Sequence, residues 1–96
     1  MIPKVTRVTA KPNYELYVTF YDAGTKLFDM KPYLNKGIFK ELQNEKYFKK
    51  VRVIWGGIEW PHEQDLSAET LYSRGILVKR SNKHKERTQS HFRHAA

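Results

Sequence analysis

Residues 14–21 alternate between two faces, and this period restricts the possible folds more than any other feature of the chain. One face carries Tyr14, Leu16, Val18 and Phe20, and the other carries Glu15, Tyr17, Thr19 and Tyr21. A period of two is typical of a strand with one buried and one exposed face. The chain is therefore expected to form a sheet with one face covered by other elements.

Turn residues divide the rest of the chain into short elements. We predict strands over residues 4–10, 25–30, 50–55 and 58–60, and helices over residues 37–43 and 66–74. Asp22-Ala23-Gly24 and Gly56-Gly57 mark hairpin turns, since glycine takes positive φ without steric cost. Asn35 is expected to cap the first helix, and Asp65 or Ser67 the second. The order β-β-β-α-β-β-α predicts an α+β fold with a mainly antiparallel sheet and helices on one face.

The basic charge of the chain is concentrated after residue 78. The formal net charge is +8; residues 1–78 carry 12 Lys/Arg and 9 Asp/Glu, whereas residues 79–96 carry 6 Lys/Arg and 1 Glu. Residues 79–96 contain too few apolar side chains to offset the entropy lost on ordering. We predict a small α+β domain over residues 1–78 and a disordered basic tail over residues 79–96. Ile76-Leu77-Val78 would form a short edge strand or tie the tail to the domain.

The composition disfavours several classes of protein. The chain has no Cys, which excludes thiol catalysis and Cys-based zinc sites. It has no apolar run of membrane-helix length, and its N-terminus lacks the apolar stretch of a signal peptide, so we expect a cytoplasmic protein without membrane contact. The sequence offers no Ser-His-Asp set, phosphate-binding glycine loop or paired carboxylates. We therefore expect no enzyme activity, no catalytic residues and no cofactor.

One short polar group could bind a metal or share a proton. His62, Glu63 and Asp65 place an imidazole and two nearby carboxylates within four residues. The group follows Pro61 and precedes a predicted helix, so the preferred interpretation is a solvated polar loop in which Asp65 caps that helix. We predict no metal site here.

A series of motifs between residues 16 and 72 is characteristic. It comprises Leu16-x-Val18-x-Phe20-x-Asp22-x-Gly24, Phe28-Asp29, Gly37, Phe39, Leu42, Phe48, Val51, Val53, the run from Ile58 to Leu66, and Leu71-Tyr72. This series resembles the bacterial family called Domain of Unknown Function 2442 over roughly residues 3–78. The resemblance implies a small α+β domain without assigned activity. Some members carry a helix-turn-helix domain after this unit, where this chain has a short basic tail, and some lie in operons that resemble toxin–antitoxin pairs.

The first functional hypothesis is a non-catalytic protein-interaction module. The candidate partner-binding residues are Trp60, Pro61, His62, Asp65 and Tyr72. Aromatic anchors dominate many interfaces, although in so small a domain the two tryptophans, Trp55 and Trp60, are better explained as core or cross-strand residues. The resemblance makes the partner of such a module a small toxin, with the tail wrapped around an acidic groove. An exposed edge strand could also pair two copies into a homodimer.

The alternative hypothesis is a nucleic-acid-associated domain. Its candidate phosphate contacts are Lys79, Arg80, Lys83, Lys85, Arg87 and Arg93. Tyr17, Thr19 and Tyr21 on the solvent side of the second strand would add contacts to bases. Binding of this kind weakens steeply with salt. A merely solvated tail, and tyrosines present only for their β-propensity, are the simpler alternatives.

Overall fold

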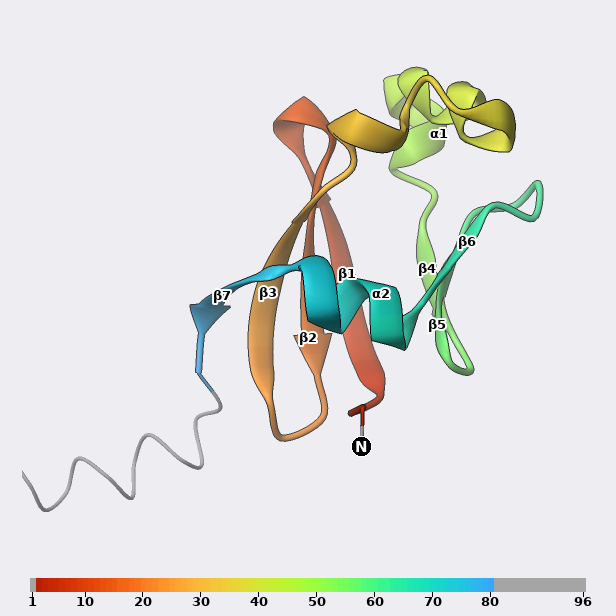
Figure 1. Cartoon of the computed structure of the whole chain (residues 1–96). Helices are drawn as coiled ribbons and strands as arrows, with labels where there is room; N and C mark the ends of the chain where they lie inside the picture. The colour runs from red at the N-terminus through yellow and green to blue at the C-terminus, as the bar shows by residue number, and fades with distance from the viewer. Residues whose placement is uncertain (1, 81–96) are drawn as a thin grey trace, which may run out of the picture.

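Two antiparallel sheets organise the chain, of which the computed structural model describes residues 2–80 (Figure 1). The larger sheet has the strand order β1-β2-β3-β7, with β1 (Val5–Lys11), β2 (Glu15–Phe20), β3 (Gly24–Asp29) and β7 (Ile76–Lys79). The smaller sheet has the order β4-β5-β6, with β4 (Arg52–Ile54), β5 (Gly57–Glu59) and β6 (Asp65–Ser67). Helix α2 (Ala68–Arg74) connects β6 to β7 and crosses the larger sheet (Figure 1). The predicted α+β class with antiparallel strands is confirmed.

The face of the larger sheet beneath α2 contributes the hydrophobic core. Leu16, Val18 and Phe20 of β2 are each 1% exposed or less, as their alternation predicts. Leu71 of α2 is fully buried, and the ring of Tyr72 packs edge-on against Phe20 with 5.2 Å between centroids. Burying an apolar side chain of this size contributes roughly 1.5–3 kcal/mol. The packing of α2 against the buried face of the larger sheet therefore contributes to stability.

Short helices fill the remaining connections. They are η1 (Pro12–Tyr14), η2 (Lys31–Tyr33), η3 (Gly37–Gln43) and α1 (Glu45–Phe48). The predicted bounds 37–43 are those of η3, but this element is a 3₁₀-helix. Asn35 does not cap η3, because the N-cap residue is Lys36, whose side chain makes no capping hydrogen bond. The side chain of Asn44 instead caps the next helix, α1, by accepting hydrogen bonds from two of its backbone N–H groups. None of the helices in residues 2–80 is long and apolar enough to cross a membrane.

Strand β6 was not expected from the sequence, which placed its last two residues in a helix. Asp65–Ser67 pair with β5 in the register Gly57↔Ser67, so α2 begins only at Ala68. The side chain of Ser67 accepts a hydrogen bond from the N–H of Thr70 at 3.2 Å, which makes Ser67 the cap rather than Asp65. The helix predicted over residues 66–74 therefore ends at the correct residue but begins two residues too early.

The two glycines of the β4–β5 hairpin have different reasons to be glycine. Gly56 has φ +86° and makes the turn, with open space where a Cβ would lie. Gly57 does not have a positive φ; it belongs to β5, and a Cβ on it would lie 2.1 Å from the carbonyl oxygen of Leu66. The expectation of positive φ at both positions is therefore correct only for Gly56.

Candidate functional site

The segment predicted to bind a partner begins inside the core. Trp60 is fully buried, its indole N–H donates to the carbonyl oxygen of Phe48 at 2.8 Å, and its ring stacks on that of Phe48 with centroids 5.9 Å apart. Trp60 is therefore a core residue, as the preferred interpretation of the sequence predicted. Trp60 thus supports the surface above it and has no side-chain area available to a partner.

The His62 loop is fastened to the short helices by a chain of hydrogen bonds. The Tyr47 hydroxyl donates to Gln64 Oε1 at 2.6 Å and accepts from the backbone N–H of His62 at 2.7 Å. The amide of Gln64, which is 1% exposed, donates to the carbonyl oxygen of Ile38 and to Glu41 Oε1, both at 3.0 Å. His62 Nδ1 lies 2.7 Å from Glu41 Oε2. The loop is therefore held by a structural network, and the roles of Tyr47, Gln64 and Glu41 in it were not expected from the sequence.

A metal site is not formed around His62 in the described part of the chain. No group of three or more His, Cys, Asp or Glu side chains within residues 2–80 could hold an ion. Asp65 lies on β6 and pairs with Glu59 of β5, while His62 contacts Glu41. The spacing in sequence suggested a shared site, but the imidazole contacts Glu41 whereas Asp65 belongs to β6, which pairs with β5.

Acid is expected to weaken the attachment of this loop. The amide of Gln64 lowers the pKa of Glu41, burial opposes that change, and His62 lowers the pKa further. Because the pKa is lower in the folded than in the unfolded chain, the interaction stabilises the fold above the unfolded pKa of about 4.3 and is lost as the pH falls through the folded value. The urea concentration at the midpoint of unfolding should therefore fall less for Glu41→Gln than for the parent chain when the pH is lowered from about 7 to about 3.

The matched control for the acid experiment is Glu45→Gln, an exposed carboxyl on α1. This variant should keep the acid sensitivity of the parent chain. Equal acid sensitivity of the Glu41→Gln variant and the parent chain would show that the Glu41 contacts do not stabilise the fold.

The remaining predicted partner residues do not form one patch with His62. Pro61 and Asp65 are exposed, and Tyr72 is half-buried on α2, where its ring lies 3.8 Å from Lys26 Nζ. Tyr72 packs on Phe20 of the larger sheet, whereas the ring of His62 stacks on Tyr47 with centroids 5.1 Å apart. The five residues are thus divided between the core, the His62 loop, β6 and α2.

The most exposed large apolar side chain in residues 2–80 is Trp55, which was expected to be a core or cross-strand residue and was not among the predicted site residues; the expectation of burial is wrong for Trp55. Trp55 is 88% exposed at the turn between β4 and β5, and Lys4 Nζ lies 5.2 Å from its ring centroid. A cavity of about 690 Å³ adjoins it, lined also by the exposed side chains of Ile2 and Val53. We call Ile2, Val53 and Trp55 the Trp55 surface. Its signal in the sequence is a tryptophan directly before Gly56, and the structure places both residues in the hairpin turn, where side chains face solvent.

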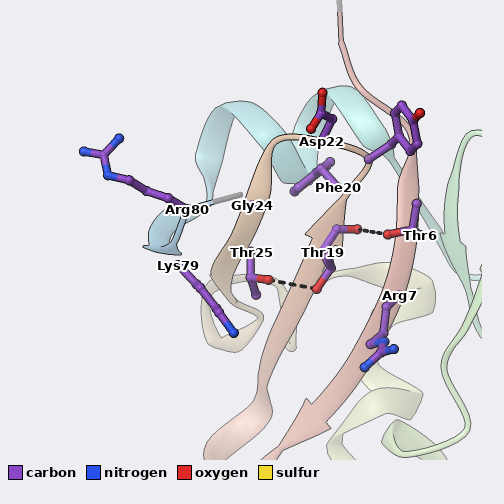
Figure 2. Close-up of a pocket in the computed structure, with 10 residues that line it drawn as sticks. Thr6, Arg7, Thr19, Phe20, Asp22, Gly24, Thr25, Lys79 and Arg80 are labelled. Atoms are coloured by element: carbon purple, nitrogen blue, oxygen red, sulfur yellow. Dashed lines mark hydrogen bonds between the residues drawn. The ribbon is translucent and has the colours of Figure 1, made fainter. Parts of the chain in front are cut away.

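The outer face of the larger sheet forms a second hollow. Figure 2 shows threonines in a row across three strands, with Arg7 on β1 and Lys79 on β7 at its two sides. Thr6 Oγ1 donates to the carbonyl oxygen of Thr19 at 3.2 Å, and the hydroxyls of Thr19 and Thr25 lie 2.9 Å apart. The cavity has a volume of about 460 Å³, and a further hollow of about 440 Å³ that reaches Tyr17 shares Arg7, Thr19, Thr25 and Lys79 with it. Tyr17 and Tyr21, which the alternation placed on the solvent side, are 38% and 70% exposed.

Only two of the predicted phosphate-binding residues lie in the described part. Lys79 ends β7, so the first residue of the expected tail belongs to the sheet, and Arg80 follows it at the rim of the cavity. Lys83, Lys85, Arg87 and Arg93 lie outside the described residues, as does the expected disorder beyond Arg80.

The last apolar run, residues 76–78, lies in a short edge strand. This was one of the two alternatives expected from the sequence. Among the strands within residues 2–80, β7 pairs with β3 alone, and its three apolar side chains are exposed: Ile76 by 67%, Leu77 by 45% and Val78 by 47%. An apolar edge of this kind can pair with another strand. A homodimer through β7 stays a prediction.

A family model covers nearly the whole described domain. No curated protein and no solved structure matches this chain. The matching model spans residues 5–76, from the first residue of β1 to the first residue of β7. It includes the alternating strand, the short helices and the Trp60 to Tyr72 segment on which the resemblance was based. The chain therefore belongs to the family described as protein of unknown function (DUF2442).

Proposed function

We propose that this chain is a non-catalytic protein-interaction module and that its partner docks on the Trp55 surface. The observation that carries the proposal is the 88% exposure of Trp55 beside the exposed side chains of Ile2 and Val53. Exposed contiguous apolar side chains next to a hollow are typical of interaction sites, and tryptophan is enriched among residues that dominate binding energy. Without a bound protein, Trp55 keeps most of its apolar surface in water, which costs free energy that binding would recover.

Charge indicates the chemistry of the partner. The chain has a formal net charge of +8, to which residues 1–78 contribute +3 (12 Lys/Arg and 9 Asp/Glu), and Lys4 Nζ lies over the indole ring of Trp55 at 5.2 Å from its centroid. A small acidic protein complements this charge, which would speed association and orient the two surfaces. The partner would insert an apolar side chain into the cavity beside Trp55 and place carboxylates near Lys4. Some family members lie in operons that resemble toxin–antitoxin pairs. They suggest that the partner is a small toxin and that binding takes place in the cytoplasm.

The proposal is tested by purifying the full chain from its native host after nuclease treatment. A stoichiometric acidic protein should remain bound; it is then identified, produced alone and titrated calorimetrically with the parent chain and with Trp55→Ser. Loss of a central aromatic anchor should weaken binding by about 30-fold or more, which corresponds to about 2 kcal/mol.

Ile38→Ser is the matched control, because Ile38 is also a large apolar side chain, 62% exposed, but lies on η3. The control should bind the partner as the parent chain does. Absence of any stoichiometric partner would contradict the interaction module, and equal binding by Trp55→Ser and the parent chain would remove the Trp55 surface from it.

A further inference from the structure

Within the described part of the chain, the outer face of the larger sheet carries cations that take part in no ion pair. Within residues 2–80, the ion pairs engage Lys31, Arg52 and His62, and none engages Arg7, Lys79 or Arg80. Of the described residues that line the cavity in Figure 2, Asp22 is the one with a carboxylate. The other acids of this face, Glu15 and Asp29, lie at the opposite end of the strands, where Lys31 contacts both at 4.0 and 3.0 Å. The described lining of the cavity at this end of the sheet therefore carries three cations and one carboxylate.

Gly24 lets the end of β7, which carries two of these cations, lie close to the β2–β3 turn. It has φ +82°, and a Cβ on it would lie 2.2 Å from the carbonyl oxygen of Lys79 and 3.2 Å from the Cα of Arg80. The end of β7 can approach the β2–β3 turn this closely only because residue 24 has no side chain. The approach places Lys79 opposite Thr25 in the pairing register and Arg80 at the cavity rim. The cationic group is thus assembled by the fold from β1 and β7.

Aromatic and hydroxyl groups lie between the cations. Tyr17 is on the exposed face of β2 with Lys11 Nζ 5.2 Å from its ring centroid, and Tyr21 lines the cavity with 70% of its surface exposed. The hydroxyl of Thr25 can donate to an acceptor while its oxygen stays near Thr19. Aromatic rings beside cations on an open sheet stack unpaired bases and contact the phosphates between them.

We infer that this sheet face binds single-stranded nucleic acid. Arg7 and Lys79 contact phosphates from the two sides of the cavity, and Tyr17 and Tyr21 stack on bases. The two adjoining hollows form one path along the strands, from Tyr21 to Tyr17 past the shared residues Arg7 and Lys79. A duplex has its bases stacked internally and offers no free base to Tyr17, so the site selects single strands. This site is separate from the Trp55 surface and does not depend on the protein partner.

The test is fluorescence anisotropy of the full chain with labelled oligothymidylate and oligouridylate over a range of NaCl concentrations. Replacing both Arg7 and Lys79 by glutamine should weaken binding and reduce the slope of log K against log salt by about 1.4, the value for two phosphate contacts to a single strand. Tyr17→Leu should weaken binding by about tenfold without changing the slope, because it removes stacking and no charge. The tighter of the two oligonucleotides identifies DNA or RNA as the natural class.

The matched control replaces Lys46 and Lys50 by glutamine, since both are exposed cations on or beside α1 and the charge change is the same. It should keep the parent affinity and slope, and Trp55→Ser should bind the oligonucleotides normally. Equal weakening in both double variants would show that only total charge matters, which overturns the proposal. Normal binding by Tyr17→Leu, displacement by polyglutamate as effective as by oligonucleotide, or no binding at low salt would also overturn it.

Discussion

Urea unfolding of Trp60→Ala is expected to give a free energy of unfolding about 3–5 kcal/mol lower than that of the parent chain. The Trp60 ring is fully buried and stacked on Phe48, so its removal leaves a large cavity between the smaller sheet and α1. The substitution also leaves the carbonyl oxygen of Phe48 without the donor that the indole supplies. Small domains have total stabilities of about 5–15 kcal/mol, so a large part of the chain population should be unfolded at low denaturant. Far-ultraviolet circular dichroism measures the transition without using tryptophan fluorescence.

Trp55→Ala is the control for this experiment, because the residue type and the change are identical. Trp55 is 88% exposed, so its replacement should change the free energy of unfolding by no more than about 0.5 kcal/mol. Similar losses in the two variants would contradict the different positions of the two tryptophans. The same Trp55 change should affect binding of the partner, so the pair separates stability from function.

Gly57→Ala is expected to destabilise the chain by about 1–3 kcal/mol although its backbone is ordinary strand. A Cβ at this position would lie 2.1 Å from the carbonyl oxygen of Leu66, which belongs to the neighbouring strand and cannot move alone. β5 and β6 would have to separate, and the N-cap of α2 at Ser67 would move with β6. Hydrogen exchange should therefore become faster in β6 and at the first turn of α2.

Gly56→Ala is the comparison, because Gly56 has open space around its missing Cβ but a φ of +86°. Alanine there should cost about 1–2 kcal/mol through backbone strain. Its hydrogen exchange should stay slow in β6, since no strand is pushed aside. Faster exchange in β6 for both variants would show that the hairpin turn, and not the close strand contact, controls this sheet.

The acidic partner and the single-stranded nucleic acid are proposed for different parts of the molecule. The Trp55 surface lies beside the smaller sheet, and the cationic face lies on the larger sheet. β1 contributes to both, because Val5 lines the cavity beside Trp55 and Arg7 lines the cavity of the cationic face. Each variant set tests one surface and leaves the other unchanged. Failure of one proposal therefore does not decide the other.

Local patterns of the sequence were enough to predict most elements of the fold. The alternation in residues 14–21 identified β2 and its buried face, because a strand places successive side chains on opposite sides whatever its neighbours are. Turn residues located the β2–β3 and β4–β5 hairpins, and Ser67 was foreseen as one of two caps for α2. The charge step after residue 78 and the family motifs also depend only on the order of residues.

Only the tertiary structure decided which of these residues meet. β6 has three residues and no pattern of its own, and it is a strand because β5 lies beside it. Trp55 and Trp60 are equivalent in composition, yet one is in solvent and the other in the core, because Trp60 follows β5 toward Phe48 while Trp55 remains at the turn. The cationic face combines Arg7 with Lys79, residues 72 positions apart in sequence, through pairing of β7 with β3. Contacts between distant segments depend on packing free energy of the whole chain, which no local pattern contains.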